Sequence, residues 1–223
     1  MFSEEGVHIE LHYKLMEQDT VNRTEEILDN VWEYVDENGK MNDEFFYFYF
    51  IAHTAKHFRH GGCGIKPLLD LWILINKLPQ NEKRDTLLEQ GSLIKFEKNL
   101  VKLTAVWFSD AASDELTDKI TRYILLGGVY GKKEQYVLVG RAKEGGRLKY
   151  VLSRMLLPYD TIRYQYPVLN KHKYLTPFFQ VVRWFRILFG GKIKSSADEL
   201  KMSDKLSTAK IEENAQMLEE LGI

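Results

Sequence analysis

Two side chains that can bind a metal ion stand two positions apart near the start of the sequence. Glu10 and His12 fall within the stretch from Val7 to Tyr13, where apolar and polar residues alternate. This period of two is typical of a strand with one buried face, so both side chains project from the same face. A carboxylate placed there suits a hard cation such as Mg²⁺. The same spacing fits the solvated face of an edge strand, and both interpretations stay open.

A second candidate pair, His53 and His57, lies four residues apart in a predicted helix. This spacing places both imidazoles on one helix face, where they could bind zinc. The intervening Thr54 to Lys56 lack the Glu of the metalloprotease pattern, which removes the main support for a hydrolase. The two histidines could instead join a buried carboxylate such as Asp70 in a structural hydrogen-bond network. Cys63 adds one soft ligand to a weak metal signature.

A third candidate is the stretch from Lys171 to Lys194, which has six basic residues, no acidic ones and many aromatic side chains. Such a helix could lie on a membrane surface or stack on nucleotides. It could also pack in a core with Arg183 and Arg186 at its rim. We favour packing, because the apolar residues nearly surround the predicted helix instead of forming one stripe.

Helices are the elements that must position most of these side chains. Capping residues and apolar spacing predict a helix from Thr24 to Val35, closed by Asn38-Gly39, and a second from Asn42 or Asp43 to His57 or beyond. Gly61-Gly62 ends the second helix. Further helices are predicted at Leu68 to Leu78, Asp85 to Phe108, Asp114 to Leu126 and Phe178 to Phe189.

Few strands are available to pair with Val7 to Tyr13. The best candidates are Tyr136 to Val139 and Leu148 to Val151. We therefore expect a mainly α fold of the α+β type, with one or two residual strands. The expected parts are a residual strand at 1–20, a helical domain at 21–126, an aromatic and basic region at 127–194, and a peripheral helix or partly frayed tail at 195–223.

Composition limits the class of protein. The 223 residues are 44% hydrophobic and carry a net charge of -1, so the chain should fold, and no overall field favours a nucleic acid partner. Cys63 is the single cysteine, and no leader-like segment opens the chain, which together favour a reducing cytoplasm. The longest apolar stretches fall far short of the roughly 20 residues that span a bilayer.

Several motifs taken in order resemble the uncharacterised nucleotidyltransferase family, whose catalytic domain has the polymerase-β-like superfold. They are Val-His-Ile-Glu-Leu-His-Tyr at 7–13, His-Thr-Ala-Lys-His at 53–57 and Gly-Ile-Lys-Pro-Leu-Leu-Asp-Leu at 64–71. The later motifs are Gly-Gly-Val-Tyr-Gly at 127–131, Tyr-Val-Leu-Ser-Arg at 150–154, Leu-Pro at 157–158 and Tyr-Pro-Val-Leu at 166–169. The resemblance covers most of the chain.

The resemblance implies metal-dependent nucleotidyl transfer from a nucleoside triphosphate to an unknown acceptor. In that superfold a Gly-Ser turn holds the phosphates, an Asp pair on one strand binds metal, and a third acid completes the site. Glu10 matches the third acid, so it is the expected catalytic residue and Mg²⁺ ligand. The turn and the Asp pair would lie before the first residue, so we expect a chain that is inactive alone: a truncated or mis-started product, a fragment, or a chain completed by a second polypeptide.

Two further expectations follow. The exposed edge of Val7 to Tyr13 predicts a homodimer. His53, His57 and Asp70 are predicted to orient helices that border the substrate cleft, with His12 beside Glu10. The alternative function is a non-enzymatic helical binding module for a protein, nucleotide or sugar ligand.

Overall fold

The computed structural model describes residues 15–16, 21–127, 133–190, 198, 201–203 and 206–223. In these parts of the chain the fold is helical, and the one β contact is an isolated antiparallel bridge between Val35 and Met41. The expected mainly α class is therefore confirmed. The predicted strand from Val7 to Tyr13, with Glu10, His12 and the proposed dimer edge, lies outside the described residues.

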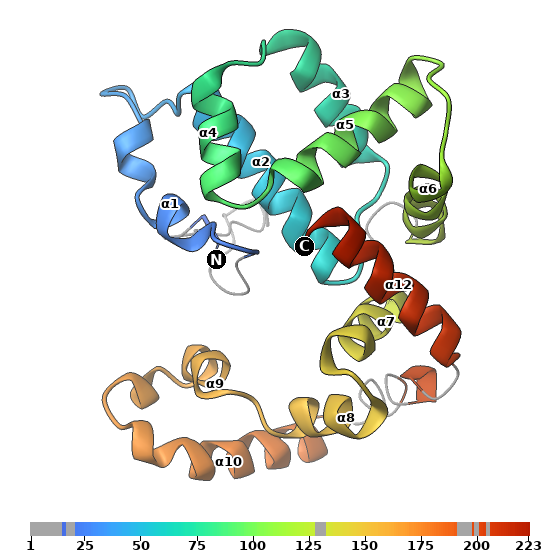
Figure 1. Ribbon diagram of the computed structural model, residues 1–223. Coiled ribbons are helices and arrows are strands. Elements are labelled where there is room, and N and C mark those ends of the chain that lie inside the picture. The colour runs from blue at the N-terminus through green and yellow to red at the C-terminus, as the bar shows by residue number, and fades with distance from the viewer. Residues whose placement is uncertain (1–14, 17–20, 128–132, 191–197, 199–200, 204–205) are drawn as a thin grey trace, which may run out of the picture.

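The helices form a body and a separate lobe, with α7 leading from one to the other (Figure 1). The body contains α1 Glu25–Asp29, α2 Asp43–Arg59, α3 Lys66–Lys77, α4 Glu82–Gln90, α5 Ile94–Phe108, α6 Glu115–Gly127 and the C-terminal α12 Thr208–Leu221. The lobe follows α7 Lys133–Glu144 and contains α8 Arg147–Met155, α9 Tyr159–Gln165 and α10 Thr176–Phe189.

The central helix of the body is α2, which begins and ends where the sequence predicted. The Asn42 side chain accepts a hydrogen bond of 2.8 Å from the Phe45 backbone N–H, so it caps the first turn. The helix ends at Arg59, just before Gly61 and Gly62, which both have positive φ. Its buried side chains are Phe45, Tyr47, Phe48, Ile51, Ala52, Thr54, Ala55 and Phe58.

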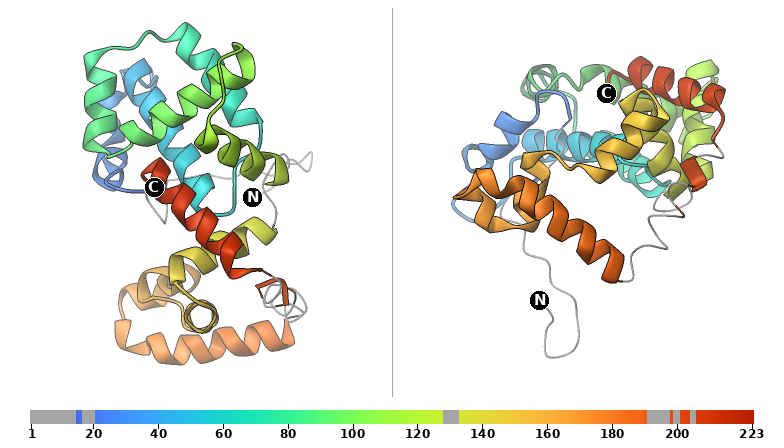
Figure 2. Two further views of the ribbon diagram at one scale, coloured as in Figure 1. Left: turned by 45° about the vertical axis from the view of Figure 1, so that its right-hand side comes forward. Right: turned by 90° about the horizontal axis from the view of Figure 1, so that it is seen from below.

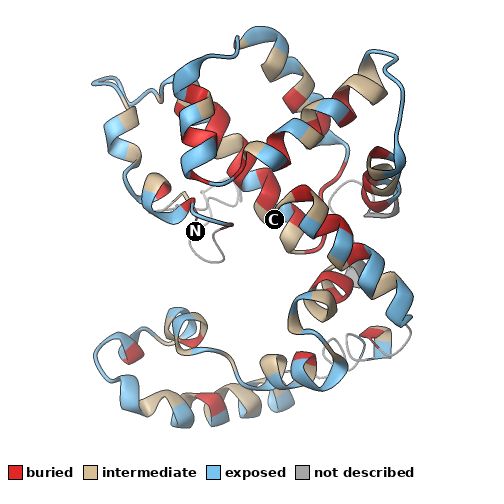
Figure 3. Ribbon diagram, in the orientation of Figure 1, coloured by how far each residue is buried: buried red, intermediate tan, exposed pale blue. Residues whose placement is uncertain are grey.

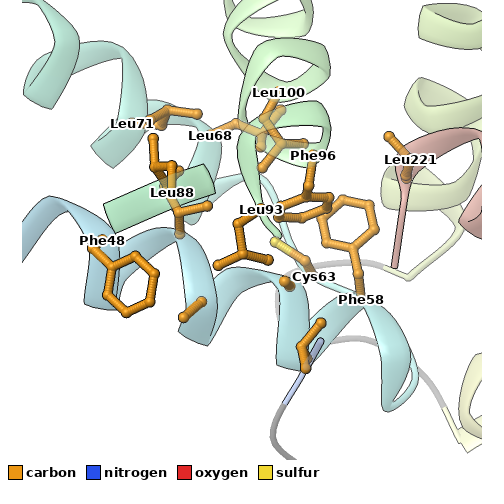
Figure 4. Close-up of a cluster of buried hydrophobic side chains, with 14 of the residues drawn as sticks. Phe48, Phe58, Cys63, Leu68, Leu71, Leu88, Leu93, Phe96, Leu100 and Leu221 are labelled. Atoms are coloured by element: carbon orange, nitrogen blue, oxygen red, sulfur yellow. The ribbon is translucent and has the colours of Figure 1, made fainter. Parts of the chain in front are cut away.

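Helices α4 and α5 pack on α2, and α3 packs on α5 to complete the core (Figure 4). The predicted helix from Asp85 to Phe108 is divided into α4 and α5 by a turn at Gly91 to Leu93. A Cβ atom on Gly91 would lie 2.6 Å from the Phe48 ring, and Ser92 has φ of 55°. The left-handed backbone of Ser92 breaks the helix, and the close approach to Phe48 explains why position 91 is glycine.

The C-terminal helix differs from its predicted role as a peripheral helix or partly frayed tail. Met217, Leu218 and Leu221 of α12 are buried in the same core cluster as α2 and α5. The Asn22 side-chain amide donates to the backbone oxygens of Ser92, at 2.7 Å, and of Gly222, at 2.8 Å. The two ends of the body are thereby held together. The four-part division of the chain stays a prediction.

Two predicted strands are wrong. Tyr136 to Val139 lies in α7 and Leu148 to Val151 lies in α8. Val137, Leu138 and Val139 are all buried, so an apolar run that a sheet could use is enclosed here within a helix. Among the described residues, no helix is both long and apolar enough to cross a membrane.

Gly61 provides a test of how closely α7 packs on the end of α2. Its φ is +119°, and a Cβ there would lie 2.8 Å from the Tyr136 Cα. We expect Gly61→Ala to lower the free energy of unfolding by about 2 to 4 kcal/mol, because the α7 backbone must move.

Gly39→Ala is the matched control, since Gly39 has φ of +78° with open space around it. Its expected cost is about 1 kcal/mol, from backbone strain alone. Urea denaturation of both variants makes the comparison. Equal losses would show that the contact between α2 and α7 is not tight.

Candidate functional site

The first wall of the candidate site is a short turn between α1 and α2. The predicted helix from Thr24 to Val35 ends early, and a 3₁₀ helix at Val31–Tyr34 follows α1. The bridge between Val35 and Met41 then reverses the chain. The Asp36 carboxylate accepts hydrogen bonds of 2.9 Å from the backbone N–H groups of Asn38 and Lys40. These bonds fix the turn that the sequence marked with Asn38-Gly39.

The facing wall is formed by the first turns of α2 and α4. Asn81 caps α4 by accepting a hydrogen bond of 2.9 Å from the Arg84 backbone N–H. The same side chain donates to Glu44 Oε1 at 3.1 Å, which joins the starts of the two helices. Between the walls lies a groove of about 660 Å³, lined by Glu33, Tyr34, Val35, Asp36, Lys40, Met41, Asn42, Asp43, Glu44, Leu78, Pro79, Asn81 and Arg84.

Arg84 is the most buried charged side chain that lines this groove. It is only 5% exposed, and its guanidinium carbon lies 4.3 Å from the centroid of the Tyr47 ring. One terminal nitrogen donates to the Leu78 carbonyl oxygen at 3.2 Å, and Nε lies 4.0 Å from the Asp85 carboxylate. Nε has no hydrogen-bond partner in the structure. The guanidinium is therefore held in place with one polar group unsatisfied.

Behind Arg84, two buried polar side chains connect α2 with α5. The Tyr47 hydroxyl donates to Glu97 Oε1 at 2.7 Å. Burial, and after it the Glu97 carboxylate, raise the pKa of Tyr47 well above its usual value. Tyr47 thus stays protonated and keeps donating its hydrogen bond. The charge at Arg84, the ring of Tyr47 and the carboxylate of Glu97 form a fixed row from the groove into the core.

The charges that line the groove favour a ligand that is polar or cationic. Four carboxylates, at Glu33, Asp36, Asp43 and Glu44, face only two basic residues, Lys40 and Arg84. A triphosphate would meet repulsion from these carboxylates, whereas a hydroxyl or ammonium group would meet hydrogen-bond acceptors. The groove therefore suits the part of a ligand that does not carry the phosphates.

The structure brings together the two histidines of the predicted pair. The His53 and His57 rings meet edge to face with their centroids 4.5 Å apart on α2. Both side chains reach the surface, yet partial burial lowers the pKa of each; the neighbouring His57 and Lys56 lower that of His53 further. Lys56 also lowers the pKa of His57. Both imidazoles are therefore held largely neutral at neutral pH.

Asp70 and Cys63 have other partners. The Asp70 carboxylate pairs with Lys66 Nζ at 2.6 Å, one turn away on α3, and is only partly buried. Cys63 is buried, its thiol donates to the Gly64 carbonyl oxygen at 3.3 Å, and burial raises its pKa to about 12. Within the described ranges, no three His, Cys, Asp or Glu side chains are grouped to hold a metal ion. The predicted metal site at Glu10 lies outside those ranges.

Sequence reasoning missed Arg84, Tyr47 and Glu97. Tyr47 and Glu97 are 50 positions apart; Tyr47 stands among aromatic residues, and Glu97 lies between Phe96 and Leu100 beside other polar residues. Polar residues inside predicted buried faces were the available signal, because such groups require partners. No local spacing rule could have paired them.

The histidine pair predicts how stability depends on pH. A base whose pKa is lower in the folded chain binds fewer protons there than in the unfolded chain, so folding opposes its protonation. The neutral histidines therefore add no penalty to the free energy of unfolding above pH 6.5, the pKa of the unfolded chain. As pH falls below that value, the unfolded chain gains protons first and the free energy of unfolding decreases. We expect the unfolding free energy to fall between pH 7.5 and 5, and to fall less in His53→Gln/His57→Gln.

Urea denaturation at each pH measures the effect. A slope that is the same with and without the pair would contradict the assignment.

Comparison with known proteins finds a family similarity in the first part of the chain. Residues 1–108 match the family model described as uncharacterised nucleotidyltransferase, which confirms the family resemblance over that segment. Every residue that lines the groove falls within it. Searches of curated proteins and of solved structures found no match.

Proposed function

We propose, from the match of residues 1–108 to the uncharacterised nucleotidyltransferase family, that this chain serves metal-dependent transfer of a nucleotidyl group to an acceptor. Glu10 is the proposed metal-binding carboxylate, from its place in the family resemblance. A bound Mg²⁺ would neutralise charge on the triphosphate. The described residues do not offer a set of ligands for that ion, so no step of the reaction is assigned to them.

By itself this chain is proposed to bind substrates without turning them over. Residues 1–223 contain no Asp-X-Asp pair. Nucleotidyl transfer often uses two cations about 4 Å apart, and a lone carboxylate cannot hold both. The nucleotide substrate and the single Cys63 thiol are both compatible with a cytoplasmic location, which we propose as well.

The groove beside Arg84 is the proposed acceptor site. Its four carboxylates disfavour the triphosphate and favour hydroxyl or amino groups on the acceptor. Arg84, only 5% exposed, adds a fixed donor at the edge of the groove. The observation that supports this role most directly is the position of the whole groove between residues 33 and 84, inside the family match.

The nucleotide role is tested by calorimetry with each of the four Mg²⁺-nucleoside triphosphates. We expect Mg²⁺-dependent binding that weakens at least about tenfold in Glu10→Ala, because a cation ligand is removed. Glu5→Ala, an acid in the same segment, is the control and should bind as the parent does. Binding that is indifferent to Mg²⁺ and to Glu10 would favour the non-enzymatic binding module.

His57→Ala separates a structural from a catalytic role for the histidine pair. We propose that His53 and His57 orient helices, so His57→Ala should lower stability while Mg²⁺-nucleotide binding remains. Loss of nucleotide binding in His57→Ala, with Glu10→Ala unaffected, would reverse these assignments.

The acceptor site is tested with spermidine as a cationic probe. Glu33→Gln/Asp43→Asn should weaken its binding about fivefold or more at low salt, because two nearby charges are removed. Glu25→Gln/Glu26→Gln on α1 removes two acids outside the groove lining and is the matched control. Equal weakening in both double variants would show a general surface effect and contradict a site in the groove.

A further inference from the structure

A row of large apolar side chains on α10 faces solvent. Phe178, Val181, Phe185, Leu188 and Phe189 are all exposed; Phe178 is 60% and Phe189 84% exposed. Their spacing of three or four residues places them on a single stripe about 100° wide. The expectation that α10 packs its apolar residues in a core is therefore wrong, since the residues of the apolar stripe are exposed. Figure 3 shows most of α10 as exposed or intermediate.

The opposite face of α10 fixes this orientation. Gln180 is buried and donates to the Leu157 carbonyl oxygen at 2.5 Å. Arg183 donates to the Arg154 carbonyl oxygen at 2.7 Å, and Trp184 Nε1 to the Met155 carbonyl oxygen at 2.8 Å. These polar contacts hold the helix against the end of α8. The apolar stripe cannot turn inward without breaking all of them.

Helix α8 carries a second exposed apolar row, at Leu148, Leu152, Met155 and Leu156. Leu148 is 73% exposed. The row again follows helical spacing, and its last turn supplies the carbonyl groups that bind α10. Both rows therefore belong to the same lobe, in which α10 forms the edge farthest from the body (Figures 1 and 2).

The lobe also concentrates positive charge. Residues 147–197 contain ten Lys and Arg and a single acid, Asp160, whereas the rest of the chain has ten more acidic than basic residues. Lys171, Lys173 and Arg186 are exposed at or near α10. Such asymmetry within a nearly neutral chain is typical of a segment that meets an anionic surface.

We infer that the lobe formed by α8, α9 and α10 docks on an anionic lipid bilayer, with the apolar stripe of α10 immersed at the headgroup boundary. Exposed Phe and Leu side chains flanked by Lys and Arg are the features of a helix that lies in such an interface. Lys and Arg would meet the lipid phosphates and carboxylates. This inference does not depend on the proposed nucleotidyl transfer.

Two other occupants fit the lobe less well. A second copy of the chain would bring an equally basic lobe against this one in a two-fold contact, and like charges repel. A nucleic acid could stack on the exposed Phe rings, but Val181 and Leu188 on the same face offer it neither a ring nor a charge. An anionic lipid bilayer can bury the apolar stripe and can also pair with the positive charge of the lobe.

Cosedimentation of the full chain with vesicles tests the inference. Vesicles of phosphatidylcholine with about 30% phosphatidylserine should bind the chain at least about tenfold more tightly than phosphatidylcholine alone. Phe185→Ser/Phe189→Ser should reduce binding to the anionic vesicles about tenfold or more, because two stacked exposed rings are removed. Lys173→Glu/Arg186→Glu should abolish the preference for anionic lipid.

Trp32→Ser is the matched control, because Trp32 is 79% exposed on the body, away from the lobe. It should bind vesicles as the parent does, and circular dichroism should show all variants folded. The inference would be overturned if the chain did not bind vesicles, or bound anionic and phosphatidylcholine vesicles equally. It would also be overturned if Trp32→Ser lost as much vesicle binding as Phe185→Ser/Phe189→Ser. A dimer that Phe185→Ser/Phe189→Ser dissociates without vesicles, or an RNA oligonucleotide that binds more tightly than the vesicles, would overturn it as well.

Discussion

The burial of α2 is the constraint on which the body depends. Phe45, Phe48, Ile51 and Phe58 are fully buried, so this helix needs neighbours along its whole length. Burying a large apolar side chain stabilises a fold by about 1.5 to 3 kcal/mol, and this stabilisation is absent when no neighbouring helix removes the side chain from water. Helices α4 and α5 and the distant α12 supply that cover. The groove arises where the cover stops, at the capped first turn of α2.

Local signals predicted much of the fold. Both ends of α2 were predicted nearly to the residue, from Asn42 as a cap and Gly61-Gly62 as a stop. Capping and positive φ act within a few positions, so they can be recognised in the sequence. Predictions failed where distant contacts decide. Tyr136 to Val139 read equally as a buried strand, and the need for glycine at position 91 depends on the Phe48 ring of another helix. The burial of Leu221 likewise depends on residues that are far away in the sequence.

The candidate site was less accessible to sequence reasoning. His53 and His57 were paired correctly because helical spacing alone brings them together. Asp70 was expected to be a buried partner, but a lysine one turn earlier on its own helix pairs with it. The groove needs Tyr34, Asp43 and Arg84 from separate elements, and only the folded chain reveals that they meet. The assignment of Glu10 to metal binding stays a prediction.

The hydrogen bonds from Asn22 to Ser92 and Gly222 have a consequence for the plan of the molecule. They join the segment before α1 to the end of α12, so both ends of the chain's described part belong to the body. Between them the chain leaves the body after α6, forms the lobe and returns at α12 (Figure 1). The lobe is thus an insertion rather than an appendage. An inserted unit is tethered at two points, which restricts its rotation. Changes in its length or composition can therefore be accommodated without separating α2 from the helices that cover it.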